Sequence, residues 1–275
     1  MRPAPLLSLW HLTSLDAPTV AVVWTLAFAW AARVRLPAWL PIVLALSAWS
    51  FYIGDRLLDS RHARTPLRER HHFHWRHRRI FIPLAVTSGV VGLVLVLHFM
   101  PIAARERNSV LAAAAIAYFT SVHSPWRPSP RKFRIPKELL VGILFTLACV
   151  LPAWTRITGP HVFTLRLAAL PAILSFVALA WLNCHAIEAW ESGFEINCAT
   201  IRRRGFTLAW IVGLAAAAML FLHHPRYAAL LLAASLSATL LSVLDLQRQR
   251  LAPVVLRAAA DLVLLTPLAM LVLAG

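Results

Sequence analysis

Long apolar stretches recur along the whole chain, all but the last of them without a charged residue, and they constrain its fold more than any other feature. A helix needs about 20 consecutive apolar residues to cross about 30 Å of hydrocarbon. The stretches cover residues 17–32, 36–54, 80–104, 108–126, 139–155, 167–187, 205–225, 227–244 and 251–275. They predict an all-α integral membrane protein, a bundle of nine transmembrane helices that forms one polytopic domain over residues 1–275.

The composition excludes an ordinary soluble domain, because 60% of the 275 residues are hydrophobic and only 14% are charged. A net charge of +16 would suggest a nucleic-acid partner in a soluble protein. Here the basic residues are sorted by loop. With nine helices and a cytoplasmic N-terminus, 19 of the 27 Lys and Arg residues fall on the cytoplasmic side and 7 on the outside. Basic residues favour cytoplasmic loops, so we expect a multi-pass protein of the cell (inner) membrane and no nucleic acid.

Two aspartates, Asp55 and Asp59, close the second apolar stretch. Acids at the C-terminal end of a helix oppose its dipole, and two carboxylates four residues apart repel each other by roughly 0.2–0.5 kcal/mol. Hard oxygen ligands at this spacing suit Mg²⁺, which binds through one or two carboxylates together with substrate phosphates. The pair predicts a magnesium site, and the alternative is two interfacial acids that pair with Arg56 or Arg61.

A second acidic set ends the sixth stretch. Glu188 and Glu191 follow Asn183 there, and the two glutamates lie three residues apart on one face of a helix. Ionisable residues at membrane depth are candidates for function. The alternative is a solvated turn beyond the membrane. In the ninth stretch Arg257 and Asp261 lie four residues apart, and this spacing predicts a pair within that helix.

Four histidines lie between residues 71 and 77, at His71, His72, His74 and His77. Such a cluster is typical of a metal site. It also fits a basic interfacial helix that turns His and Arg toward anionic lipid, or a role around a bound diphosphate. The sequence leaves these three interpretations open.

Nine helices, an Asp-x-x-x-Asp pair that ends the second helix and an Asn-plus-acid segment that ends the sixth resemble the UbiA superfamily of intramembrane prenyltransferases. The resemblance implies Mg²⁺, an isoprenyl diphosphate and a lipophilic acceptor in the membrane. It implies that Asp55, Asp59, Glu188 and Glu191 act as metal-binding catalytic residues. It further implies that Asn183, Arg64, Arg68 and Lys137 bind the substrate and neutralise the departing diphosphate.

The chain departs from the family pattern at two positions. Phe51 stands where the first motif has Asn, and Ile187 stands where the second motif has its middle Asp. Glu188 follows by one residue, which places it about 100° around the helix. These departures keep a second interpretation open, a non-catalytic protein of the same fold that binds a lipid or pigment. A transporter is the third, and it is disfavoured because the acids gather at one membrane face instead of the midplane.

Overall fold

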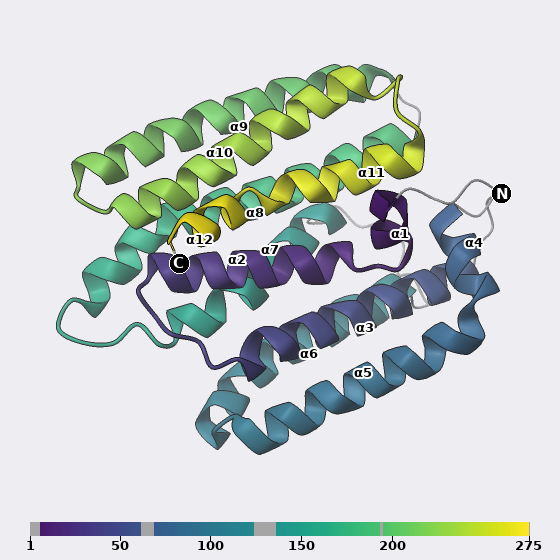
Figure 1. Cartoon of the computed structure of the whole chain (residues 1–275), viewed down its shortest axis with the longest axis horizontal. Coiled ribbons are helices and arrows are strands. Elements are labelled where there is room, and N and C mark those ends of the chain that lie inside the picture. The colour runs from purple at the N-terminus through teal and green to yellow at the C-terminus, as the bar shows by residue number, and fades with distance from the viewer. Residues whose placement is uncertain (1–5, 62–68, 124–135, 193–194, 275) are drawn as a thin grey trace. The chain divides into compact units, whose positions relative to one another are not determined.

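The computed structural model describes residues 6–61, 69–123, 136–192 and 195–274 (Figure 1). Every regular element in these ranges is helical, which confirms the prediction of an all-α protein. The described chain divides into two compact units. Unit 1 comprises residues 1–19 and 38–135, and unit 2 comprises residues 20–37 and 136–275. The prediction of one domain stays a prediction, and each unit is described by itself.

The helices of unit 1 begin with α1 (Leu6–Leu12), and α2 (Asp16–Ala31) begins there and continues in unit 2. Unit 1 then holds α3 (Trp39–Arg61), α4 (Glu69–Arg76), α5 (Arg78–Phe99) and α6 (Ile102–His123). Unit 2 holds α7 (Lys137–Trp154), α8 (Val162–Ser192), α9 (Glu195–Phe221), α10 (Pro225–Gln247), α11 (Pro253–Leu262), the 3₁₀ turn η1 (Val263–Leu265) and α12 (Pro267–Ala274). The short helices α1 and α4 lie outside the predicted apolar stretches.

Six described helical segments are long and apolar enough to cross a membrane. They are Arg78–Phe99, Lys137–Trp154, Val162–Glu191, Thr200–Phe221, Pro225–Gln247 and Pro253–Val272. A seventh is added if α1 and α2, which meet at 90°, form one broken span. These segments are consistent with a multi-pass membrane protein. Helices also occupy the remaining predicted stretches, but nine crossings and a cytoplasmic N-terminus stay predictions.

In unit 1, α3 and α5 pack side by side in opposite directions. Trp39 at the start of α3 stacks on Phe99 at the end of α5, with 6.1 Å between ring centroids. Further along, Ser50 donates a hydrogen bond to the carbonyl of Ala85 at 3.0 Å. The C-terminal end of α3, which carries Asp55 and Asp59, is therefore far from the Phe99 end of α5.

In unit 2, small residues let helices approach closely, as is common in membrane bundles. A Cβ atom at Gly142 of α7 would lie 3.0 Å from the backbone nitrogen of Trp181 in α8. A Cβ atom at Gly205 of α9 would lie 3.2 Å from the carbonyl oxygen of Ala238 in α10. Both glycines therefore lie at helix contacts too close for a larger side chain.

The last predicted stretch is a broken helix. It runs through α11, changes to the 3₁₀ turn η1 and resumes in α12 at Pro267. A break frees backbone carbonyls, which need partners in an apolar medium. The carbonyl of Val263 accepts a hydrogen bond from Ser237 at 2.7 Å, and that of Leu264 accepts one from Trp24 at 2.8 Å. Side chains of α10 and α2 therefore stabilise the break.

Candidate functional site

Asp55 and Asp59 lie one turn apart in the last two turns of α3. Asp55 is half-buried, whereas 45% of the Asp59 side chain is exposed. The Asp59 carboxylate lies 3.8 Å from Nε2 of His71 on α4. Because both acids are on the same side of the helix, a ligand that reaches Asp59 approaches Asp55 along the same face.

Arg56, which the sequence offered as a partner for these acids, is directed elsewhere. It is buried, and its Nε donates a hydrogen bond to Oγ of Ser14 at 2.7 Å. Its Nη2 lies 4.0 Å from Asp16. The guanidinium therefore bonds at the turn between α1 and α2. This weakens the alternative in which Asp55 and Asp59 are interfacial acids that pair with Arg56.

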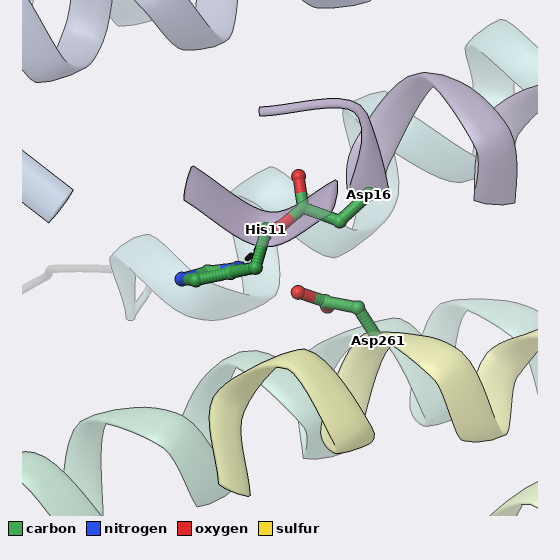
Figure 2. Close-up of side chains that lie close together, drawn as sticks. All are labelled: His11, Asp16 and Asp261. Carbon is green, nitrogen blue, oxygen red and sulfur yellow. Dashed lines mark hydrogen bonds and ion pairs between the residues drawn. The ribbon is translucent and has the colours of Figure 1, made fainter. Parts of the chain in front are cut away.

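Around Arg56 the structure gathers buried polar side chains, of which the sequence singled out only Arg56 and His74. This Arg56 cluster consists of His11, Ser14, Asp16, Arg56 and His74, all at most 3% exposed. Figure 2 shows His11 and Asp16, whose Nδ1 and Oδ2 atoms are 2.5 Å apart. The only signal in the sequence is an acid and a histidine just before a long apolar stretch. That signal carries no information about a partner some 40 residues away.

The tautomer of His74 follows from its partners. Its Nδ1 lies 2.9 Å from the carbonyl oxygen of Arg70, which can only accept, so Nδ1 carries the proton. Its Nε2 then accepts from the Ser14 hydroxyl at 3.2 Å. Burial lowers the pKa of His74 from 6.5 to about 4, and the imidazole is neutral at physiological pH. Ser14 has a left-handed backbone with φ of 59°, a strained conformation that these bonds hold in place.

The histidines of α4 face different environments. His71 and His74 are buried, whereas His72 is exposed. Oγ of Ser60 donates a hydrogen bond to the backbone carbonyl of His71 at 3.2 Å. Nε of Arg70 donates a hydrogen bond to Nε2 of the His71 ring, also at 3.2 Å. The two buried histidines therefore hold α4 against α3 and the α1–α2 corner, and His71 is the one that lies beside Asp59.

The second acidic set lies on α8. Asn183 is 5% exposed, and its amide donates to Oδ1 of Asp261 on α11 at 2.9 Å. Glu191 forms an ion pair with Arg257, also on α11. The pair between Arg257 and Asp261 within one helix stays a prediction, and the structure shows that each of them bonds to α8.

Ile187 and Glu191 limit what the second set offers a metal ion. Ile187 is 8% exposed and packs in an apolar cluster with Leu182, Ala186, Ala189, Ile201, Leu241 and Ala260. Glu191 is neutralised by Arg257. This set therefore presents less negative charge than the sequence predicts, and Glu188, which is half-buried, is its remaining acidic candidate.

The predicted basic residues are placed only in part. Lys137 is the first residue of α7, with its ammonium 3.8 Å from Glu138 and 62% of its side chain exposed. Arg64 and Arg68 lie outside the described residues. Asp55 and Asp59 belong to unit 1, whereas Lys137 and the acids of α8 belong to unit 2. A site shared by these groups stays a prediction.

The Asp55 and Asp59 pair fits Mg²⁺ in its donor chemistry. Carboxylate oxygens are the hard ligands that this ion prefers, and Mg²⁺ often takes one or two of them while phosphate and water complete its shell. The exposure of Asp59 leaves room for such a shell. Comparison with known proteins finds no matching family model, no similar curated protein and no similar solved structure.

Proposed function

We propose that this chain is a multi-pass membrane prenyltransferase of the UbiA type, which moves an isoprenyl group from its diphosphate to a small lipophilic acceptor with the help of Mg²⁺. The observation that carries the proposal is the carboxylate pair at the end of α3. Asp55 and Asp59 share one helix face, Asp59 is open to solvent, and the neighbouring Arg56 bonds to Ser14 and Asp16.

In this proposal the protein works mainly by electrostatic stabilisation of a leaving group. Asp55 and Asp59 hold Mg²⁺, which when bound neutralises charge on the diphosphate oxygens. The bond between C1 of the isoprenyl chain and the diphosphate oxygen breaks, and its electron pair leaves with the diphosphate. The acceptor supplies the electron pair of the new bond to C1 and releases a proton to water. Arg64, Arg68 and Lys137 neutralise the released diphosphate. Glu188 on α8 acts as a further metal-binding carboxylate.

A second candidate is a protein of the same kind that binds a lipid or pigment without catalysis. Three observations favour it. Phe51 packs edge-to-face on Phe119 of α6, with centroids 5.7 Å apart, where the family has Asn. Ile187 is part of an apolar cluster, and Glu191 is occupied by Arg257. Both candidates bind an isoprenoid or similar lipid, and they differ in Mg²⁺ dependence and turnover.

The test is Mg²⁺-dependent binding of a long isoprenyl diphosphate to the detergent-purified protein. Asp55→Asn and Asp59→Asn remove the charge with little change in volume. Glu106→Gln is the matched control, because Glu106 is an exposed acid of unit 1 at the start of α6. Glu106 follows Phe99 closely in the chain, and Phe99 packs on Trp39 at the start of α3. Asp55 lies near the other end of α3, so the control residue is far from the proposed metal site.

We expect saturable binding that requires Mg²⁺, is weakened at least tenfold by either aspartate substitution and is unchanged in the control. Binding that is indifferent to Mg²⁺ and to both substitutions would refute the metal site. An acceptor screen follows with the wild-type protein. Release of diphosphate with formation of a prenylated product supports the enzyme, whereas Mg²⁺-dependent binding with no product for any acceptor favours the non-catalytic candidate.

A further inference from the structure

The four histidines between residues 71 and 77 do not converge on one point in the structure. His74 bonds through both of its ring nitrogens, and Nδ1 of His77 lies 2.8 Å from a carbonyl oxygen of the preceding helical turn. His71 is buried, whereas His72 is exposed. Rings that are already bonded or that point to different sides of a helix do not share one ion. This weakens the interpretation of the cluster as a metal site.

The exposed side of this segment is basic. Arg76 is the last residue of α4, and Arg78 and Arg79 are the first two residues of α5. All three are exposed, and in the described part of the chain none of them forms an ion pair. Glu69 is the one acid on these two helices, and it lies seven residues before Arg76, about 10 Å away along the helix axis. The exposed side therefore carries an excess of positive charge.

Directly after these arginines the exposed surface becomes apolar. Figure 1 shows α4 leading into the start of α5, which is one of the helices long and apolar enough to cross a membrane. In its first half Ile80, Ile82 and Val86 are 58%, 48% and 61% exposed. Apolar side chains that are exposed on a membrane helix face acyl chains, so the arginines just before them lie at the level of the lipid headgroups.

Trp75 holds Arg78 at this level. The guanidinium carbon of Arg78 lies 4.8 Å from the centroid of the Trp75 ring, and its Nη1 donates to the carbonyl of Trp75 at 3.0 Å. Trp75 is itself 38% exposed, and tryptophan is enriched at the membrane–water interface. A guanidinium has five N–H donors and can bind a phosphate through two of them at once. Arg78 is therefore an ordered group that can bind a lipid phosphate.

We propose that Trp75, Arg76, Arg78 and Arg79, the basic corner between α4 and α5, bind an anionic phospholipid. The phosphate contacts the arginines, and the acyl chains lie along the exposed side of α5. Charge complementarity favours an anionic lipid over a zwitterionic one, whose headgroup carries its own positive charge. The apolar side of α5 favours a lipid over an acidic protein or a soluble phosphate, because neither of these would cover it.

This surface is separate from the site of the proposed prenyl transfer. None of its four residues is assigned to Mg²⁺ or to the diphosphate. The residue of α4 that lies beside Asp59 is His71, which is buried on the inner side of the helix. Loss of lipid binding and loss of isoprenyl diphosphate binding can therefore be observed independently.

The test is native mass spectrometry of the delipidated full-length protein, titrated with dioleoyl phosphatidylglycerol or with dioleoyl phosphatidylcholine, which has the same acyl chains. Glycerol 3-phosphate is the anionic probe without acyl chains. One triple variant combines Arg76→Gln, Arg78→Gln and Arg79→Gln, and a second places Lys at the same three positions. The matched control combines Arg33→Gln, Arg35→Gln and Arg107→Gln, which removes the same charge from three exposed arginines outside α4 and α5.

Each basic residue near an anionic headgroup contributes about fivefold in affinity. We therefore expect the wild type to bind phosphatidylglycerol at least tenfold more tightly than phosphatidylcholine. This preference disappears in the Gln variant, persists in the control and is intermediate in the Lys variant, which keeps the charge but loses two-point binding of phosphate. Glycerol 3-phosphate does not displace the lipid at equal concentration.

The wild type decides the question even if a variant fails to fold. Equal affinity of the wild type for the two lipids would overturn the proposal, and so would displacement of phosphatidylglycerol by an equal concentration of glycerol 3-phosphate. A preference that persists in the Gln variant, or that disappears equally in the control, would show that the basic corner is not the binding surface.

Discussion

Replacing Gly205 by alanine should destabilise the protein through the contact between α9 and α10. A Cβ atom at this position would lie 2.0 Å from Oγ of Ser242 and 3.2 Å from the carbonyl oxygen of Ala238. Ser242 is buried, and its hydroxyl donates to that same carbonyl at 2.9 Å. The new methyl group therefore has to displace the hydroxyl and press against backbone that belongs to a packed helix.

The change in the free energy of unfolding caused by Gly205→Ala is the balance of two terms. Gly→Ala within a helix gains about 1 kcal/mol of helix propensity, and overpacking a close contact costs about 1–3 kcal/mol. Gly213, also on α9, isolates the first term, because the nearest atom to its added Cβ is Oγ of Ser235 at 3.7 Å, an ordinary contact. We expect Gly213→Ala to be about 1 kcal/mol more stable than wild type and Gly205→Ala to be about 1–3 kcal/mol less stable than Gly213→Ala.

The assay is unfolding by SDS in mixed micelles, followed by the fluorescence of the eleven tryptophans. The double variant Gly205→Ala with Ser242→Ala should recover part of the loss, since it removes the 2.0 Å contact but keeps the 3.2 Å contact with Ala238. Equal stabilities of the two alanine variants, or full recovery in the double variant, would show that the close approach of α9 and α10 does not set the cost.

Three further predictions concern buried polar groups. Because the pKa of His74 falls to about 4 in the folded protein, the unfolded chain binds more protons there between pH 6.5 and 4. Stability should therefore drop by about 3 kcal/mol as pH falls through this range and show a smaller drop in His74→Gln, measured by unfolding at several pH values. Removing either partner of the Glu191–Arg257 pair should cost about 1–4 kcal/mol, and a double-mutant cycle with Glu191→Gln and Arg257→Met should give a coupling energy above 0.5 kcal/mol; additive losses would contradict the pairing. Trp24→Phe should cost about 1–3 kcal/mol, because the carbonyl of Leu264 loses its donor, and a stability equal to wild type would mean that water replaces the indole.

The sequence predicted the all-α class because the hydrocarbon core allows a lone apolar segment little other than a helix. It also located Asp55 and Asp59, whose spacing is a local property of one helix. It did not predict where Arg56 is directed, since the side chain bonds to Ser14 and Asp16 about 40 residues earlier in the chain. Partners so distant leave no periodic signal.

For Asn183 and Asp261, too, the sequence determined one part and the tertiary structure the other. Their residue types and their depth in apolar stretches were readable, and each is unusual enough in a membrane helix to be a candidate. Their pairing, the break of the last helix at η1 and the burial of Ile187 depended on how α8, α10 and α11 pack. Hydrophobicity along the chain therefore determined the long helices, because it depends on each segment alone, but it did not predict the short helices α1 and α4. Tertiary packing determined which polar groups meet, because hydrogen bonds between helices depend on the rotation and depth of each helix against its neighbours.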